Sequence, residues 1–281
     1  MVDNGSTPAL APYPGVIWVR SPDNLGFAGG NNLGFLKTSR PHILLLNNDT
    51  RLPSAAAVET LLAFLAAHPA VGAAQGTLYL PDGTLDACGE RLTGCGLLFH
   101  RGYRERPGAL SAQPAEVLAG KGAFLMLRRS AIEAAGGLFR ADFFCYYEDV
   151  ELCHRLWLAG YEVWYVPTAG VWHDEGSSAR RLPARRIWQM YLSNMWASAR
   201  SHWGWRAWLR MGPGFLLAMA GACLLRGFLP KRRAQAPVFQ RQVAERNFLP
   251  RVTERVTWRY YFTLAKRFLQ RRRQVPEQQG E

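Results

Sequence analysis

The sequence has 281 residues, of which 48% are hydrophobic, and this length and composition suit one substantial globular core. Its five cysteines form an odd number without a Cys-x-x-Cys pair, which argues against a disulfide framework or a zinc knuckle and favours free thiols in a reducing compartment. The formal net charge of +13 is unevenly placed, because residues 180–273 carry about +19 and the remainder about −6. We expect a mildly acidic globular part followed by a basic segment, with no signal peptide at the start.

The first fifty residues predict strands that end in polar loops. Residues 1–7 are typical of a strand end that runs into an Asp-Asn-Gly-Ser turn, and residues 16–19 predict a short buried strand. Residues 24–35 indicate a Gly/Asn-rich loop leading into a helical turn, where glycine permits close approach to a ligand. The apolar run 42–47 predicts a parallel strand buried on both faces. It ends at residues 47–50, and such polar strand ends are where α/β sheets bind ligands.

The next segment is less regular. Pro53 is expected to start a helix that continues to about Ala67. Residues 71–80, the turn at residues 81–83 and the residues from Thr84 onward predict a hairpin or two edge strands. Residues 88–115 are rich in Gly, Arg and Pro and indicate a long loop.

Strands and helices then alternate up to residue 166. Residues 120–127 predict a strand, and a capping box at 130–133 predicts a short helix that ends at Gly136 and Gly137. A further strand is expected over residues 161–166. The alternation predicts an α/β fold with a mostly parallel sheet.

The carboxylates Glu148 and Asp149 lie between an aromatic cluster and a helix expected to end at Gly160. They are therefore placed at a helix N-terminus, where the backbone amides and the dipole favour an anion. Aromatic packing around carboxylates suits a pocket that holds a base. The alternative is an acidic turn that only starts the helix.

The character of the chain changes from about residue 180. Residues 187–208 predict a helix with five tryptophans, and residues 211–225 form an apolar run too short to span a bilayer. With their basic surroundings they favour a segment lying in a membrane interface. The alternative is a helical hairpin packed on the main domain. Residues 252–273 predict a basic amphipathic helix.

Four motifs in order resemble the family 2 glycosyltransferases of the GT-A fold, most closely the bacterial rhamnosyltransferase-like branch. The resemblance covers residues 1–178, and it implies a catalytic domain over 1–179 followed by a basic, partly apolar helical extension over 180–281. The motifs are residues 2–6 beside the nucleotide, the Asn-Leu-Gly-Phe-Ala-Gly-Gly-Asn-Asn loop at 24–32, Asn47-Asn48-Asp49 in the place of an Asp-x-Asp metal motif, and the acceptor-side block from Gly136 to His173.

The resemblance implies inverting transfer of a sugar from a nucleoside diphosphate donor to a hydroxyl group. Asp149 would be the general base, with Glu148 orienting the acceptor or the base. Asp49 and His173 would hold Mg²⁺ or Mn²⁺. The residues expected to bind the substrates are Asp3, Asn4, Asn24, Gly29, Asn32, Asn47, Lys121 and Gly122.

Two departures from the family pattern stand out. The family has a strand upstream of Val2, which this sequence lacks at its start. Asn47 replaces the first Asp of the metal motif, so we expect weaker metal binding because an amide contributes no charge.

The resemblance suggests dTDP-rhamnose or a UDP-sugar as donor and a glycan or lipid-linked acceptor in the synthesis of cell-envelope polysaccharide. We expect a cytoplasmic protein, peripheral at the inner face of the cell membrane and bound to its anionic surface. One alternative is a degenerate transferase that acts as a scaffold. Another is a nucleic-acid-binding protein that uses its basic tail, although no nucleic acid is expected as a partner.

Overall fold

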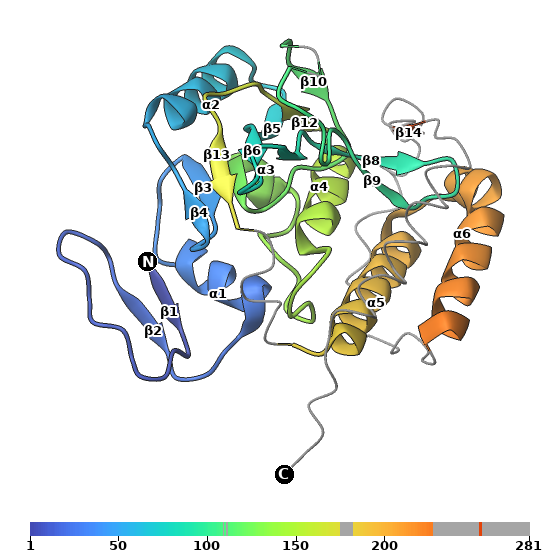
Figure 1. Cartoon of the computed structure of the whole chain (residues 1–281), viewed down its shortest axis with the longest axis horizontal. Helices are drawn as coiled ribbons and strands as arrows, with labels where there is room; N and C mark the ends of the chain where they lie inside the picture. Colours follow the sequence, from blue (N-terminus) through green and yellow to red (C-terminus); the bar gives the residue numbers. More distant parts are fainter. Residues whose placement is uncertain (109, 111, 175–181, 227–252, 255–281) are drawn as a thin grey trace.

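The computed structural model describes residues 1–108, 110, 112–174, 182–226 and 253–254. The expected helix over 252–273 lies outside these residues, apart from the short strand β14 (Thr253–Glu254). The described chain is an α/β structure in which helices flank a central sheet (Figure 1). This confirms the predicted fold class.

The central sheet is mixed, whereas a mostly parallel sheet was expected. Only β12 and β5 pair in parallel, and β11 runs antiparallel between β5 and β3. The apolar pattern of a buried strand carries no information about direction, which explains the error. The strand order is β10 (Ala115–Glu116), β12 (Glu162–Tyr165), β5 (Val71–Gln75), β11 (Phe124–Arg128) and β3 (His42–Leu46).

Strand β5 lies in the middle of the sheet and is buried at every residue, so the expectation of edge strands over 71–80 was wrong. Its small residues let the helices approach closely. A Cβ on Gly72 would lie 2.8 Å from Tyr161 Cβ and 3.0 Å from Ala131 Cβ. The hairpin expected around the turn at residues 81–83 is confirmed, and it forms between β6 (Leu78–Tyr79) and β7 (Leu85–Ala87).

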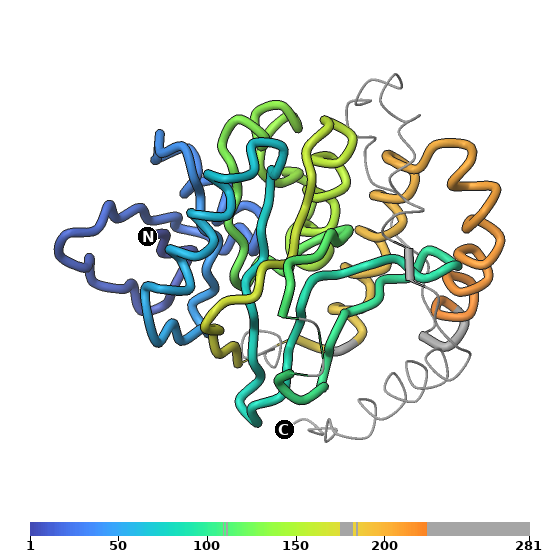
Figure 2. The backbone as a smooth tube through the Cα atoms, turned by 90° about the horizontal axis from the view of Figure 1, so that it is seen from above, coloured from blue at the N-terminus to red at the C-terminus, as the bar shows by residue number. Residues whose placement is uncertain are grey.

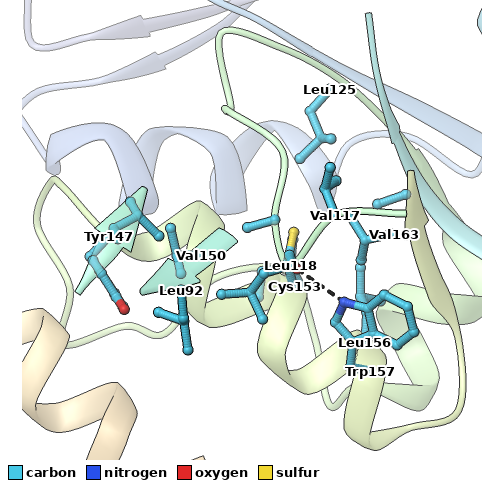
Figure 3. Packing of buried hydrophobic residues seen from close by; sticks show 14 of the residues in the cluster. Leu92, Val117, Leu118, Leu125, Tyr147, Val150, Cys153, Leu156, Trp157 and Val163 are labelled. Atoms are coloured by element: carbon cyan, nitrogen blue, oxygen red, sulfur yellow. Dashed lines mark hydrogen bonds between the residues drawn. The ribbon is translucent and has the colours of Figure 1, made fainter. Parts of the chain in front are cut away.

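The two faces of the sheet carry separate cores because side chains alternate along a strand. Phe124 and Met126 pack with helix α2 (Ala56–Ala67) in one cluster. Leu125 and Leu127 belong to the other cluster, with α3 (Arg129–Ala134) and α4 (Glu148–Leu158). Figure 3 shows part of this second cluster, where Trp157 Nε1 donates to the carbonyl of Leu118 at 3.0 Å.

Three smaller sheets surround the central one. Strand β1 (Val2–Asn4) pairs in parallel with β2 (Val19–Ser21). Strands β4 (Thr50–Arg51) and β13 (Val171–His173) join β6 and β7. The region expected to be a long loop contains a hairpin of β8 (Glu90–Thr93) and β9 (Leu98–His100).

Two further expectations about local structure were wrong. Residues 26–35 form the helix α1 (Gly26–Phe35), because tertiary contacts outweigh the poor helix propensity of Gly and Asn. The capping box is absent: α3 follows β11 directly, and its first turn receives no side-chain cap. The end of α3 is confirmed, since Gly136 and Gly137 have positive φ and their amides donate to Glu133 and Ile132.

The basic segment begins with two helices, α5 (Ala184–His202) and α6 (Trp205–Arg226), which lie beside the β8–β9 hairpin (Figure 2). Met211, Phe215 and Met219 are buried in the α4 cluster, so the alternative of a packed helical hairpin is confirmed for this face of α6. The predicted domain boundary falls within residues 175–181, which lie outside the described residues, and it stays a prediction. None of the helices in the described part combines the length and hydropathy needed to cross a membrane.

Candidate active site

Helix α4 starts from an unusual turn. Tyr146 and Tyr147 both have φ of 71°, in the left-handed region that non-glycine residues rarely adopt. Two such residues in succession cost on the order of 1–3 kcal/mol each and persist only when surrounding contacts enforce them. The turn directly precedes Glu148 and Asp149, which places both carboxylates at the start of the helix as predicted.

Asp149 is held by backbone amides on both oxygens. Its Oδ2 accepts from the Gly122 amide at 2.9 Å, and its Oδ1 accepts from the Val150 amide at 2.8 Å. Burial, together with the nearby charge of Glu90, raises the pKa of Asp149 to about 6, although these two amides act in the opposite direction. Asp149 is therefore a stronger base than an ordinary aspartate, yet it is mostly ionised at neutral pH.

Glu148 differs from its neighbour. Its side chain is almost fully buried, and within the described part of the chain its Oε2 finds no hydrogen-bond partner. Burial and the charge of Asp149 raise the pKa of Glu148 well above its usual range. The higher pKa favours the protonated form of Glu148, which donates a hydrogen bond and does not act as a base.

Strand β7 contributes Asp86, a buried carboxylate that the sequence analysis missed. Its Oδ1 accepts from Lys121 Nζ at 2.7 Å, and its Oδ2 lies 2.7 Å from His173 Nδ1. Burial alone would raise the pKa of Asp86, but His173 and Lys121 hold it at about 2. A signal was available: Asp86 is a single acid between the apolar residues Leu85 and Ala87.

His173 joins Asp86 to Asp49. Its Nε2 lies 3.4 Å from Asp49 Oδ1, so the two predicted metal ligands meet. Burial lowers the pKa of His173, but hydrogen bonds to Asp49 and Asp86 more than offset this and raise it to about 9. An imidazole held by a carboxylate on one nitrogen and facing a second carboxylate on the other is a common arrangement around protein-bound metals.

The donor set is compatible with a divalent cation that has few protein ligands. Among the described residues, no cluster contains three or more His, Cys, Asp or Glu side chains suited to a metal. Asn47, two residues before Asp49, has a buried Oδ1 without a hydrogen-bond partner in the same part of the chain. These side chains offer hard oxygen atoms and one imidazole, as Mg²⁺ or Mn²⁺ requires.

Lys121 and Gly122 link the two groups of carboxylates. The Lys121 ammonium binds Asp86, and the next amide, of Gly122, binds Asp149. The Lys121 amide itself donates to Gln75 Oε1 at 2.8 Å, which fixes this peptide to the central strand β5. The pair Asp49–His173 and Asp149 are therefore linked through two consecutive residues.

The other predicted substrate-binding residues lie around α1, and most of their polar groups hold the backbone. Asp3 accepts from the amides of Ser6 and Leu10 and from Arg20, and its pKa is lowered, mainly by Ser6. Asn4 and Asn24 both bind the start of α1 at Gly26. Gly29 lies within the helix itself.

Asn32 joins α1 to the segment before the active-site turn. Its amide group donates to the Phe139 carbonyl and accepts from the Phe139 amide, both at 2.9 Å. The ring of Phe27, also on α1, packs against Phe139, and a Cβ on Gly122 would lie 3.2 Å from the Phe27 ring. Helix α1 therefore borders the peptide that holds Asp149.

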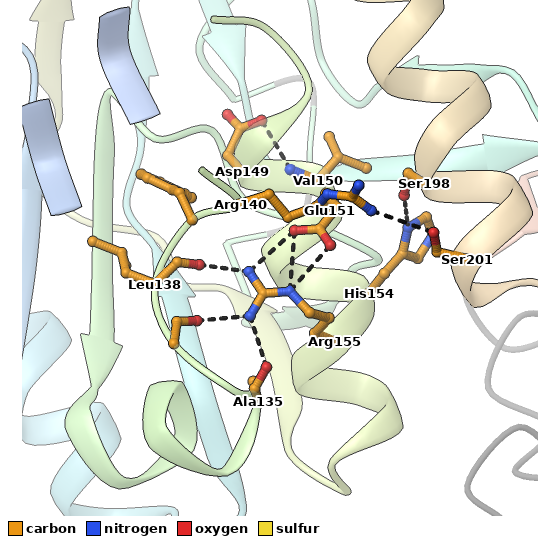
Figure 4. A network of polar contacts seen from close by, with 12 residues as sticks. Ala135, Leu138, Arg140, Asp149, Val150, Glu151, His154, Arg155, Ser198 and Ser201 are labelled. Atoms are coloured by element: carbon orange, nitrogen blue, oxygen red, sulfur yellow. Dashed lines mark hydrogen bonds and ion pairs between the residues drawn. The ribbon is translucent and has the colours of Figure 1, made fainter. Parts of the chain in front are cut away.

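Helix α4 is fixed by a buried network (Figure 4). Arg155 forms an ion pair with Glu151 at 3.0 Å and donates to the carbonyls of Ala135, Gly137 and Leu138. His202 on α5 lies 2.8 Å from the other oxygen of Glu151. Asp149 therefore lies on a helix that is anchored on both sides.

Comparisons with known proteins identify the family. The model of the family described as "Glycosyl transferase family group 2" matches residues 42–244. An N-acetylglucosaminyl-diphospho-decaprenol L-rhamnosyltransferase of Mycobacterium tuberculosis, found in two strains, is 28% identical over 83% of this chain and 85% of its own length. An uncharacterized protein of Sinorhizobium fredii is 25% identical over 57% of this chain and 18% of its own length.

Solved structures agree about the fold. The crystal structure of GalNAc-T7 with UDP, GalNAc and Mn²⁺ matches with a TM-score of 0.53 at 14% identity, over 74% of this chain and 40% of that protein. The family match covers more than half of the sequence and confirms the resemblance drawn from its motifs. The chain belongs to the family 2 glycosyltransferases, and it has their GT-A fold.

Proposed function

We propose that this glycosyltransferase transfers a sugar, with inversion, from a nucleoside diphosphate to an acceptor hydroxyl, with Asp149 as the general base. One observation carries the proposal: Asp149 accepts from the Gly122 amide, one residue from Lys121, whose partner Asp86 also binds His173. A proton acceptor thus lies beside a group of side chains suited to a charged diphosphate. The family match favours this enzyme over the scaffold and nucleic-acid alternatives.

In the proposed step the acceptor oxygen attacks the anomeric carbon of the donor sugar. The new carbon–oxygen bond forms as the bond to the phosphate oxygen breaks, and the nucleoside diphosphate leaves with the bonding electron pair. The acceptor proton passes to Asp149. A single displacement with one base inverts the anomeric centre. The protonated Glu148 orients the acceptor through its O–H group.

Asp49 and His173 would hold Mg²⁺ or Mn²⁺, with Asp86 fixing the imidazole from behind. A divalent cation there would neutralise the charge that develops on the leaving diphosphate. The Mn²⁺ named with the solved GalNAc-T7 structure supports this assignment. Asn47 supplies a neutral oxygen where a carboxylate would bind more tightly.

The donor would lie along α1 at Gly29 and would also contact Asn47, Lys121 and Gly122. The backbone around it would be shaped by Asp3, Asn4, Asn24 and Asn32. The name of the mycobacterial relative specifies an L-rhamnosyl group and a lipid-linked acceptor. We therefore take dTDP-rhamnose as the first donor to test, with UDP-sugars next. Glycan or lipid-linked acceptors place the reaction in the synthesis of the cell envelope.

A lipid-linked acceptor would bring the enzyme to a membrane surface, and α6 offers a suitable face. Trp205, Leu209 and Leu217 are 66%, 71% and 76% exposed. The exposed Arg206 and Arg210 lie on the same helix, and residues 182–226 contain no acidic residue. An apolar, cationic face of this kind suits the interface of an anionic bilayer, so we propose a peripheral protein at the inner face of the cell membrane.

The membrane proposal is tested by flotation with vesicles of phosphatidylglycerol and phosphatidylethanolamine. Leu209→Gln with Leu217→Gln should lower the bound fraction at least about threefold, because each change removes apolar contact. Leu36→Gln is the matched control, because Leu36 is 77% exposed and lies far from α6 in the sequence. Equal flotation of all variants would reject α6 as the binding face.

The function itself is tested by calorimetric titration of TDP and UDP with and without Mn²⁺, followed by turnover of the donor sugar. We expect Mn²⁺-dependent nucleotide binding that Asp49→Ala abolishes. Binding without transfer to any lipid-linked acceptor would argue against the proposed acceptor class. Absence of nucleotide binding would reject the proposed function.

A further inference from the structure

Helix α5 contacts the left-handed turn before the base through one fully buried side chain, Asn194. Its Nδ2 donates to the carbonyl of Cys145 at 3.1 Å and to that of Tyr146 at 2.6 Å. Both partners are carbonyl oxygens, so the amide nitrogen must face them. Asn194 therefore binds the two peptide groups on either side of the first residue with positive φ.

An asparagine is a poor choice for this position on general grounds. It lowers helix propensity, and burying its amide costs free energy unless partners are supplied. Its Oδ1 is buried and has no hydrogen-bond partner within the described residues. Helix α5 nonetheless places Asn194 against the turn. The two hydrogen bonds to the turn explain why an asparagine occupies this position.

A second contact from α5 supports the next residue. The ring of Tyr191 meets that of Tyr147 edge-on, with centroids 5.6 Å apart and planes at 86°. The carbonyl of Tyr147 in turn accepts from the Glu151 amide at 3.0 Å, which opens the first turn of α4. Two neighbouring residues of unfavourable conformation are thus each held by α5 before the chain reaches Asp149.

We infer that Asn194 is a positioning residue, which holds the Cys145–Tyr147 turn in its left-handed form and so aims the Asp149 carboxylate at the acceptor hydroxyl. This inference rests on the proposed role of Asp149 as base. It also means that the basic helical segment takes part in building the active site.

The test compares two buried residues one helical turn apart. Asn194→Leu keeps the size of the side chain and removes the donor, whereas Ser198→Ala removes a contact of Ser198 Oγ with His154 Nδ1 at 3.0 Å, which does not involve the turn. We expect Asn194→Leu to lower kcat by about 100-fold with the KM for the donor nearly unchanged, because misplacing a reacting group has effects of this size. Ser198→Ala should keep the kcat of the unmodified enzyme.

A rescue experiment separates positioning from a general loss of structure. Glycine adopts a φ of 71° without strain, so Tyr146→Gly should restore at least about tenfold of the kcat lost in Asn194→Leu. Equal kcat values for Asn194→Leu and Ser198→Ala, or a double variant no faster than Asn194→Leu alone, would overturn the inference.

Hydrogen exchange keeps the inference testable if the unmodified protein transfers no sugar, in which case the proposed function fails by itself. The Glu151 amide, which donates to Tyr147, should exchange faster in Asn194→Leu than in Ser198→Ala. Equal exchange in the two variants would show that Asn194 does not hold the turn.

Discussion

The site contains two buried groups of carboxylates with opposite electrostatics. Around Asp86 every acidic charge faces a cation, and the pKa of Asp86 is held at about 2. Around Asp149, burial and the nearby charge of Glu90 raise its pKa to about 6. Similar burial therefore produces a permanently charged anchor in one place and a proton acceptor in the other, and the difference comes from Lys121 and His173.

Replacing the base should have the largest effect. Asp149→Asn keeps the acceptor for one backbone amide but cannot take a proton, so kcat should fall by about 10²–10⁴. The protein should at the same time become more stable, by about 1 kcal/mol, because a raised pKa means that the ionised form destabilises the fold and the side chain is only partly exposed. Turnover and thermal unfolding measured on the same sample check both. A variant that keeps a tenth of the activity would contradict the assignment.

Removing the charge of Asp86 should disrupt its contacts with Lys121 and His173. Asp86→Asn leaves Lys121 and His173 without their anion, and we expect Mn²⁺-dependent nucleotide affinity to fall about 10–100-fold. Titration calorimetry measures this, with Asp82→Asn on the neighbouring exposed turn as the control. Unchanged affinity would mean that the Asp86–His173 pair has no part in binding.

The pH dependence should separate the two groups. At the base, kcat should rise with pH through about 6 as Asp149 loses its proton. Stability should fall over the window from its ordinary pKa of 3.8 to about 6, because the folded state binds the extra proton there. For Asp86 the sign is opposite: its contribution is present above 3.8 and is lost as the pH falls towards about 2. In Asp149→Asn, the free energy of unfolding measured with urea from pH 3 to 8 should no longer decline between about pH 4 and 6.

Glu148→Gln should have the smallest effect. Burial and the charge of Asp149 favour the protonated, uncharged form of Glu148, so the pH midpoint of kcat should move by less than about 0.5 and kcat should fall less than about tenfold. A midpoint that drops by a full unit would show instead that Glu148 is ionised beside Asp149.

The features that the sequence predicts well depend on short stretches. The presence of a strand before Asn47, the glycines that end α3 and the carboxylates at the start of α4 each follow from neighbouring residues. The buried, parallel position expected for that strand was wrong, because β3 is an antiparallel edge strand. The motifs in these stretches also identify the family. Local pattern carries this information because strand ends, helix ends and capping positions are local structures.

The features that it misses depend on partners far along the chain. Asp86 binds Lys121 and His173, which lie 35 and 87 residues away. Residues 26–35 become a helix although their composition predicts a loop, and Asn32 is held by Phe139, 107 residues later. Asn194 gives no local signal either, since its two acceptors precede it by 49 and 48 residues. The pattern of residues within a short window of sequence carries no information about such contacts.

The succession of Lys121 and Gly122 has a consequence for engineering the substrate specificity of this enzyme. One peptide unit connects the charged group around Asp86 to the amide that holds Asp149, and a Cβ on Gly122 would lie 3.6 Å from the carboxylate and 3.2 Å from Phe27. Under the proposed roles, a change that admits a different donor on one side should also shift Asp149 on the other. Selection for a new sugar should recover compensating substitutions at Phe27 or Phe139, which pack against each other beside Gly122.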